Sequence, residues 1–583
     1  MPDILLTASF ISLLSELRPA FTAPSFANFA VIISGMVHAL GAHRMTDVLR
    51  AAGPAANKHY VTYYRWLSHG RWSLDELGLA LLALIIQLGE MTGVEIELVL
   101  DDTLCRRTGK NVALATMHAD PLLKVRGRPF SRYGHVFVVL AVHVRMPALS
   151  ATGWALPIMF RLFEGSRQGG RLDAASDKRR RLGRRRRGVT ERNRERLTDR
   201  EVVQGKVARC KDKADTGTLA DKVRPTKTQL AAEMLLIVAR RFPQLRMRVL
   251  TDHLYNCKAV LHEVTSQVDN ISFVTRGHPD AALFGMPEPR KPGQRGRPAI
   301  RGERLPNPEQ WAADNPDAFE SVVVSMYGHD VPVLIASFFG MAYRSLPGQL
   351  VRYVIIKDPQ GIYRTDYLLC TDQELPAAEV VAAYARRWPL EQTFECCKQK
   401  LGMQNTQVQL PASVRRHPPV TMLLYSLVVL WYLHHGRHLA DKARLPPDPW
   451  YKGNARPSFT NMLACLRRAS WGEEFVDPSF LAATATKSDR VGRSDRLDRR
   501  AALARYLVRV VAAGGGDPLK SSLGSNPFKQ RPSQATAPPP PAPRARCGAA
   551  ARPNKAGNTG DSHSVRSLPW RRPGHDPTPS CRA

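Results

Sequence analysis

Residues 94–103 read VEIELVLDDT, an apolar and β-branched run that ends in two aspartates and a threonine. This run predicts a buried strand over residues 94–100, with Asp101 emerging where the strand ends. Two more apolar runs follow, GHVFVVLAVHV (134–144) and GWALPIMFRLF (153–163). Both are rich in β-branched and aromatic residues, so we expect three strands in succession.

The chain then alternates between helix and strand patterns. TKTQLAAEMLLIVARRF (226–242) has apolar residues at helical spacing, and Thr226 is suited to cap its first turn. LRMRVL (245–250) and ISFVTR (271–276) predict strands, and β-rich runs recur over residues 320–370. Three strands, a helix and a further strand are the order of an α/β fold rather than of a β-sandwich.

The charge and hydrophobicity of the chain indicate what kind of partner it binds. The 583-residue chain has 44% hydrophobic residues and a formal net charge of +33, which favours a polyanionic partner, and nucleic acid is the commonest one inside a cell. A membrane surface is the competing polyanion, but no apolar run reaches the roughly 18 residues of a spanning helix. The longest, Val420–Leu433, predicts a buried helix, and Asp3 stands where a secretory signal has Lys or Arg. We therefore expect a cytoplasmic protein without a membrane segment.

Changes in composition divide the chain into four expected parts: a helical segment that we expect to bind DNA (1–92), an α/β core (93–440), a second helical region (441–513) and a disordered tail (514–583). Inside the core, a basic insert is expected at 164–225, where Lys and Arg fill every position from Lys178 to Arg187 except Leu182 and Gly183. This run is expected to be solvated, to lie on DNA phosphates, or both. A β-rich insertion is expected at 277–375.

Aromatic residues in the first helical part leave two interpretations open. Tyr63, Tyr64 and Trp66 lie among His and Arg residues in HYVTYYRWLSHGRW (59–72). They either contact DNA or pack in the interior of the helical segment. Ser73 is expected to cap the helix that follows.

The strongest local signal is VVAAYARRWPLEQTFECCKQKLG (380–402). It places Tyr384, Arg387, Glu391 and Lys398 at Y-x2-R-x3-E-x6-K spacing. Glu391 and Lys398 are two helical turns apart on one face. That face offers a carboxylate for a metal ion and a cation for a DNA phosphate, whereas an amphipathic surface helix with an ordinary ion pair is the alternative.

Pro389 predicts where this helix begins, because proline is favoured at the first helical position and excluded from the interior. Glu391 then lies in the first turn, where the helix dipole favours a carboxylate or the metal it binds. Gly402 predicts the end of the helix.

Two aspartates complete a candidate metal site. Asp101 and Asp252 each follow a β-branched run, and Asp101 is preferred over Asp102, which we expect to point into a turn. Together with Glu391 they can hold two Mg²⁺ ions, with Mn²⁺ as an alternative, roughly 3.5–4 Å apart. An isolated aspartate after a strand is otherwise a turn or cap residue. The nine cysteines have no C-x-x-C pairs, so a zinc site is not expected.

The segment 384–402 resembles the signature of the DDE transposases of bacterial insertion sequences, in the group named for its Tyr-Arg-Glu-Lys motif. LVLDDT (98–103) resembles that group's first catalytic strand and VLTDHLYN (249–256) its second. GRPAIRGERLP (296–306) is also similar to these proteins, and the resemblance covers residues 40–440.

The resemblance implies an RNase H-like core with a β-strand insertion before the catalytic glutamate. It implies Mg²⁺-dependent cleavage at element ends and strand transfer into target DNA by a homodimer, in the bacterial cytoplasm and associated with the nucleoid. Asp101, Asp252 and Glu391 then become the catalytic metal ligands. The residues implied to contact DNA are Tyr384, Arg387 and Lys398.

Two positions depart from the group's pattern. Leu254 stands where a small residue is common, and Pro389 lies beside the catalytic glutamate. Both keep a second hypothesis open, a catalytically decayed transposase that acts only as a DNA-binding protein. A third hypothesis is an RNA-processing nuclease with similar metal chemistry.

Overall fold

The computed structural model describes residues 4–89, 95–109, 112–125, 128–146, 150–164, 224–289, 297, 299–361, 364–438 and 457–476. The chain divides into two compact units, and nearly all described residues belong to the first, which contains Met1–Glu474. The basic run Lys178–Arg187 and the tail 514–583 lie outside the described residues, as does most of 441–513.

Five helices precede the first strand: α1 (Ala8–Ser15), α2 (Ala23–His38), α3 (Met45–Ala52), α4 (Tyr60–His69) and α5 (Leu74–Leu88). Ser73 caps α5 as predicted, because its side chain accepts a hydrogen bond from the backbone N–H of Glu76. Tyr63 and Trp66 are buried, and the Trp66 ring stacks near Phe29. Packing is therefore the role of Tyr63 and Trp66, whereas Tyr64 is 37% exposed.

A ten-stranded mixed sheet forms the centre of the fold, with the order β2-β3-β1-β5-β6-β12-β11-β10-β9 and with β4 paired to β3. β1 is antiparallel to β3 and parallel to β5, and β5 is parallel to β6. The strands of the ten-stranded sheet are β1 (Ile96–Arg106), β2 (Thr116–Val125), β3 (Arg128–Met146), β4 (Ser150–Phe163), β5 (Met247–Thr251), β6 (Ile271–Arg276), β9 (Glu320–Met326), β10 (His329–Gly340), β11 (Val351–Lys357) and β12 (Asp366–Cys370).

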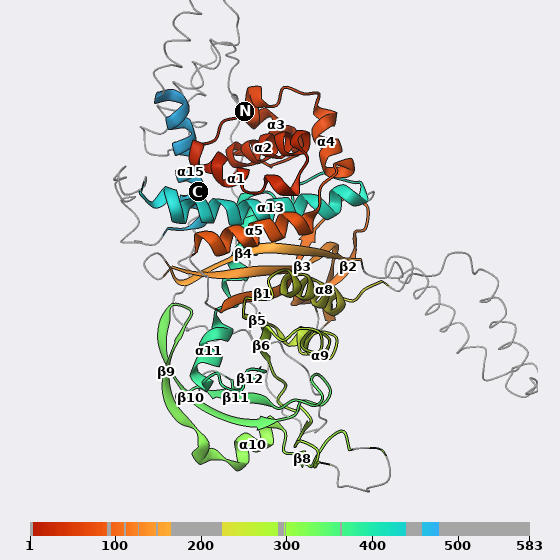
Figure 1. Ribbon diagram of the computed structural model, residues 1–583, viewed down its shortest axis with the longest axis vertical. Helices are drawn as coiled ribbons and strands as arrows, with labels where there is room; N and C mark the ends of the chain where they lie inside the picture. The colour runs from red at the N-terminus through yellow and green to blue at the C-terminus, as the bar shows by residue number, and fades with distance from the viewer. Residues whose placement is uncertain are drawn as a thin grey trace, which may run out of the picture. The chain divides into compact units, whose positions relative to one another are not determined.

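Helices cover both faces of this sheet (Figure 1). α5 and α13 (Pro411–Trp431) contact β4, and in Figure 1 they lie on one side of β3 and β4 while α8 (Lys227–Arg241) lies on the other. α11 (Ala377–Ala385) contacts β5, β6 and the strands from β9 to β12. The remaining elements include α9 (Leu261–Thr265), α10 (Pro308–Asp314), α12 (Pro389–Lys400), α15 (Phe459–Val476), the π-helical turn Tyr432–Gly436 and the two-stranded pair β7 (Leu283–Phe284) and β8 (Arg304–Leu305).

The architecture is mixed α/β, as the order of apolar runs predicts. Thr226 caps α8 with a capping box, and β6 has the bounds expected for ISFVTR. Strands β9 to β12 continue the same sheet beyond β6. Among the residues that the structure describes, no helix is both long and apolar enough to cross a membrane.

The end of the first expected strand was predicted wrongly. The strand expected over 94–100 continues to Arg106, so Asp101 lies inside β1 rather than at its end. The reason is a partner that is distant in sequence, because β3 pairs with β1 as far as Arg106 opposite Gly134. β2 was not predicted, and it pairs with the other edge of β3.

Candidate active site

Asp101 lies on β1, and Asp252 directly follows β5, the parallel neighbour of β1. The register of β1 and β5 pairs Leu100 with Thr251, and each aspartate is the next residue along its chain. The pairing of β1 with β5 ends there, while Asp101 remains paired with Val139 of β3. Both carboxylates are therefore placed at the point where the parallel ladder opens.

The Asp252 carboxylate is held by the residue that follows it. Its Oδ1 accepts hydrogen bonds from the backbone N–H of His253 at 2.7 Å and from His253 Nδ1 at 3.0 Å. Burial would raise the pKa of Asp252, but the hydrogen bonds and charge of His253 prevail and hold that pKa below its usual value. Leu254, which departs from the family pattern, is partly buried and packs against the core.

Glu391 lies in the first turn of α12, which begins at Pro389 as the sequence predicts. Gly402 follows this helix with a φ of +65°, a backbone conformation that favours glycine, so the predicted helix end is confirmed as well. The Glu391 side chain is 38% exposed. Lys398, two turns further on, is partly exposed.

The Arg387 side chain links β1 to α12 through two hydrogen bonds. Its Nη1 donates to Asp101 Oδ2 at 2.6 Å, and its Nη2 donates to Glu391 Oε1 at 3.1 Å. The guanidinium lies 5.8 Å from the centre of the Tyr384 ring. Although burial opposes the charged form, Asp101 and the other acidic neighbours raise the pKa of Arg387, so the guanidinium stays protonated. Arg387, for which the resemblance implies DNA contact, is thus buried in an ion pair.

Asp101 and Asp102 face different partners, because successive side chains of a strand point to opposite faces. Asp102 was expected to point into a turn, and this expectation is wrong. Asp102 lies within β1, and its Oδ2 accepts a hydrogen bond from Lys227 Nζ at 2.8 Å. Burial and the charge of Asp102 raise the pKa of Asp101 to about 7, against the opposing charge of Arg387.

Tyr255 is a residue of this neighbourhood that the sequence did not single out. It is fully buried. Burial, together with the charges of Asp102, Asp101 and Asp252, raises the pKa of Tyr255 well above its usual value. The sequence HLYN (253–256) gave no sign that Tyr255 belongs to the site, except that Tyr255 is close to Asp252 in the chain.

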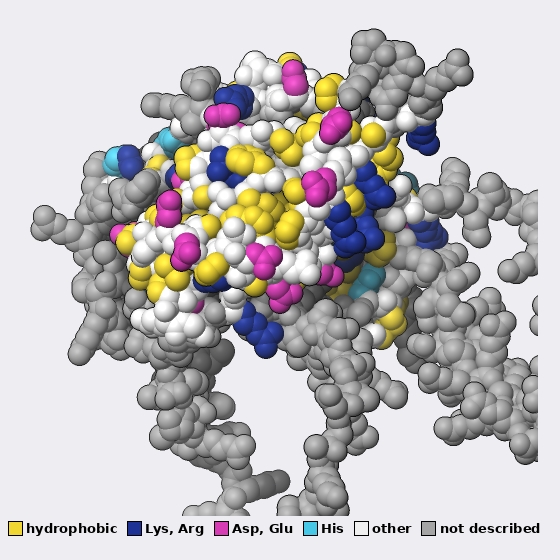
Figure 2. All heavy atoms as spheres, turned by 90° about the horizontal axis from the view of Figure 1, so that it is seen from below, with side chains coloured by type: hydrophobic (Ala, Val, Ile, Leu, Met, Phe, Trp, Pro, Cys, Tyr) yellow, Lys and Arg dark blue, Asp and Glu magenta, His cyan; other side chains and the backbone are white. Residues whose placement is uncertain are grey.

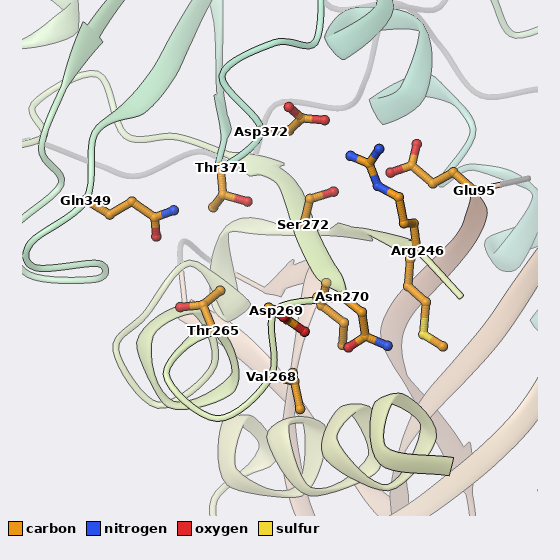
Figure 3. A pocket seen from close by; sticks show the side chains of 12 residues that line it. Glu95, Arg246, Thr265, Val268, Asp269, Asn270, Ser272, Gln349, Thr371 and Asp372 are labelled. Carbon is orange, nitrogen blue, oxygen red and sulfur yellow. The ribbon is translucent and has the colours of Figure 1, made fainter. Parts of the chain in front are cut away.

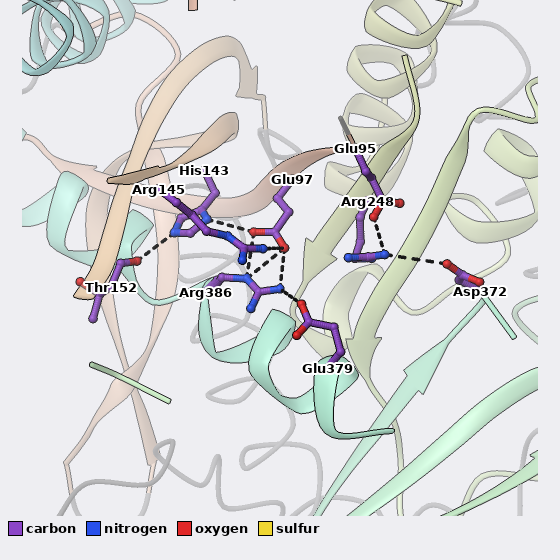
Figure 4. A network of polar contacts seen from close by, with 9 residues as sticks. All are labelled: Glu95, Glu97, His143, Arg145, Thr152, Arg248, Asp372, Glu379 and Arg386. Atoms are coloured by element: carbon purple, nitrogen blue, oxygen red, sulfur yellow. Dashed lines mark hydrogen bonds and ion pairs between the residues drawn. The ribbon is translucent and has the colours of Figure 1, made fainter. Parts of the chain in front are cut away.

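A buried ionic network anchors the segment before Arg387 (Figure 4). Arg386 donates to both carboxylate oxygens of Glu97, at 2.6–2.9 Å, and to Glu379 at 2.5 Å. Glu97 also accepts hydrogen bonds from Arg145 at 2.7 Å and from His143 Nδ1 at 3.0 Å. Burial disfavours the charged form, but His143 and Arg386 outweigh it and hold the pKa of Glu97 well below its usual value. The network fixes β1 against the end of α11, which precedes Arg387.

A cavity of about 350 Å³ lies elsewhere on the sheet. It is lined by the first residues of two strands, Met247 of β5 and Ile271 of β6, with polar side chains around them (Figure 3). Asp252 follows the other end of β5, so this cavity lies away from the acidic residues of the candidate active site.

The donor chemistry of the site suits a hard divalent cation. Asp101, Asp252 and Glu391 supply carboxylate oxygens, the ligand type that Mg²⁺ prefers. In the arrangement described here, the cation between Asp101 and Glu391 is the Arg387 guanidinium. Within the described part of the chain, no group of three or more His, Cys, Asp or Glu side chains is arranged to hold a metal ion.

A comparison with known protein families places the chain in one of them. The family model for the DDE superfamily endonuclease matches residues 16–326, more than half of the chain, and the chain belongs to this family. The match includes Asp101 and Asp252 and ends before α12, which carries Glu391.

Two other comparisons add little to this assignment. No curated protein matches the chain. A solved structure that is similar is the cryo-EM structure of the piggyBac transposase synaptic complex with hairpin DNA, at 9% sequence identity and a TM-score of 0.33, covering 90% of this chain and 84% of that chain. A likeness at this TM-score carries no conclusion about the present chain.

Proposed function

We propose that this DDE superfamily endonuclease is a DNA transposase that cleaves DNA at the ends of an insertion sequence and transfers them into target DNA. The observation that carries the proposal is the joining of Asp101 and Glu391 through Arg387, with Asp252 directly after β5, the strand that pairs with β1. Asp101 and Glu391, from distant parts of the sequence, thereby share one cation, and we propose that Asp252 completes the acidic site with them.

The core of the proposal is an RNase H-like fold. Support comes from the strand order β4-β3-β1-β5-β6, in which three antiparallel strands are followed by two parallel ones. Residues 277–375 then form an insertion that adds β9 to β12 to the same sheet. Residues 1–92 and the basic insert at 164–225 are proposed to bind DNA, since a chain of charge +33 favours a polyanion.

Asp101, Asp252 and Glu391 are the residues proposed to hold Mg²⁺, which would supply activation of the attacking oxygen and stabilisation of the leaving oxygen in an in-line displacement. The chain's own residues prepare the site. His253 keeps the Asp252 carboxylate ionised, and Arg387 holds the Asp101 and Glu391 carboxylates through its two hydrogen bonds. Tyr384, Arg387 and Lys398 are proposed to contact DNA.

The test is cleavage of duplex DNA that carries the ends of the element. We expect Asp101→Ala, Asp252→Ala and Glu391→Ala each to abolish Mg²⁺-dependent cleavage while DNA binding is retained. Glu395→Ala is the matched control, because Glu395 lies one turn after Glu391 on α12 and is exposed. Cleavage at the wild-type level by any of the three variants would refute the assignment of that residue.

The alternative is a DNA-binding protein without nuclease activity, and the closed arrangement of Arg387 between Asp101 and Glu391 is the observation in its favour. It predicts salt-sensitive DNA binding, weakened by roughly 10³–10⁵ between low and moderate salt if many phosphates are contacted. Excision activity in cells would exclude it. A preference for RNA over the matching duplex DNA would instead support an RNA-processing nuclease.

A further inference from the structure

β9 has an unpaired edge. It is the last strand on one side of the ten-stranded sheet, and it pairs with β10 without a register shift from Glu320 to Met326. No backbone hydrogen bond joins its outer edge to any residue that the structure describes. Alternate N–H and C=O groups along this edge are therefore available to another strand. β9 lies at the outer margin of the strands in Figure 1.

The edge lacks the features that usually prevent pairing with another chain. Proteins block exposed edges with Lys, Pro or bulges. The sequence of β9, ESVVVSM, contains none of these, and its one charged residue is Glu320 at the end. Val323 in its centre is 66% exposed. The lower end of the molecule in Figure 1 also displays hydrophobic side chains near the middle of its surface (Figure 2).

The order of residues in β9 is self-complementary. Residues 321–325 read SVVVS, which is the same in both directions. If two copies pair antiparallel about Val323, each Val323 faces the other, Val322 faces Val324, and Ser321 faces Ser325. A two-fold interface requires one patch to complement itself in this way. β-branched pairs directly across strands are also favourable ones.

We propose that β9 is a homodimer interface, in which two copies of this chain pair their β9 strands antiparallel about a two-fold axis at Val323 and join their sheets edge to edge. Charge favours this place, because two chains of +33 repel each other and β9 has no positive residue. One strand pair buries less than the roughly 1,200 Å² of a stable interface, so the dimer of the free chain is weak. A DNA that holds both copies raises their effective concentration and strengthens it.

Cysteine crosslinking of the full-length chain tests the register directly. In the proposed dimer, the two Cβ atoms at position 323 lie about 4.5–5.5 Å apart, close to disulfide distance. The two copies of position 321 lie four residues apart along the strand, roughly 14 Å. Under mild oxidation we expect Val323→Cys to give at least about tenfold more covalent dimer than Ser321→Cys, because disulfide geometry is specific. The double variant Ser321→Cys/Ser325→Cys is expected to crosslink as well.

The wild-type chain controls for its own cysteines in this experiment. Equal crosslinking of Val323→Cys and Ser321→Cys, or a ladder of higher oligomers, would overturn the proposal, since either means pairing without register. Sedimentation of the uncrosslinked chain supplies an independent readout. We expect Val323→Lys to lower the dimer fraction several-fold, because the substitution places like charges opposite each other. Val323→Thr should keep the dimer fraction of the wild type. The melting temperatures of both variants should equal that of the wild type. An unchanged dimer in Val323→Lys contradicts the proposal, and none of these readouts depends on nuclease activity.

Discussion

Arg387 and Asp101 are 286 residues apart in the sequence, and their side chains form a hydrogen-bonded ion pair of 2.6 Å. The pair connects the middle of β1 with the segment that starts α12. Because the same guanidinium also donates to Glu391, one cation contacts two of the three proposed metal ligands. One guanidinium carries a single positive charge, so it offsets the charge of only one of the three carboxylates.

Arg387→Met tests whether this cation stands where a metal binds. The substitution leaves Asp101 and Glu391 without their partner, and breaking a buried ion pair costs about 3 kcal/mol in the free energy of unfolding. We expect Mg²⁺ to raise the melting temperature of Arg387→Met more than that of the wild type, because the ion replaces the lost charge. Arg415→Met is the control, since Arg415 pairs with Glu164 away from the site. An equal effect of Mg²⁺ on all three proteins counts against this role.

Glu97→Gln tests the buried network by its pH dependence. The pKa of Glu97 in the folded chain lies below the usual value, so its ionised form stabilises the fold above the unfolded-state pKa of about 4.3 and this stabilisation is lost as the pH falls. We expect the variant to lose about 3–5 kcal/mol of unfolding free energy at pH 7, with the difference from the wild type shrinking below about pH 4.3. Denaturant titrations across this range measure it.

The control for Glu97 is Glu395→Gln, which changes an exposed glutamate on α12. Its difference from the wild type should stay within about 0.5 kcal/mol at pH 7, as for most surface substitutions. A pH-independent loss in Glu97→Gln would mean that the side chain contributes by packing rather than by charge.

Local signals in the sequence predicted local structure well. Pro389 and Gly402 fix the ends of α12 through their own backbone restrictions, and Thr226 and Ser73 cap helices through neighbouring N–H groups. None of these depends on a distant partner. The placement of Glu391 in a first helical turn could therefore be predicted from the sequence.

Features that depend on tertiary partners were predicted less well. The true extent of β1 follows from its pairing with β3, and the orientation of Asp102 follows from Lys227. The residues around Arg387 and Asp101 in the sequence also gave no signal for the contact between these two side chains. Glu97 did carry a local signal, because a glutamate inside the apolar run VEIELVL is unusual unless it forms an ion pair.

Gly402→Ala tests the junction after α12. A Cβ added to Gly402 would lie 2.4 Å from Cβ of His43, and the backbone has a φ of +65°. Gly348→Ala is the matched control, because Gly348 has a φ of +81° and no atom within 4 Å of an added Cβ. We expect about 1–2 kcal/mol of destabilisation for Gly348→Ala from backbone strain alone, and a larger loss for Gly402→Ala in thermal or denaturant unfolding. Equal losses would show that His43 moves aside without cost.

Exposed residues of α4 test DNA binding by the first helical segment. Tyr64 is 37% exposed and Arg65 is exposed, whereas Tyr63 on the same helix is fully buried. We expect Tyr64→Ser/Arg65→Ser to weaken binding of duplex DNA about tenfold, as lost stacking and phosphate contacts imply, with stability unchanged. Tyr63→Ser should instead destabilise the fold by about 3 kcal/mol. DNA affinity that is unaffected by the double variant excludes α4 from the DNA interface.

The most direct test of the central claim is Mn²⁺ binding, followed by electron paramagnetic resonance, on the full-length chain with duplex DNA of the element ends. If Asp101, Asp252 and Glu391 form one metal site, the wild type binds Mn²⁺ saturably, and Asp101→Asn, Asp252→Asn and Glu391→Gln each weaken that binding at least about tenfold. Wild-type Mn²⁺ affinity in all three variants would contradict the account, because the three carboxylates would then not share a metal ion.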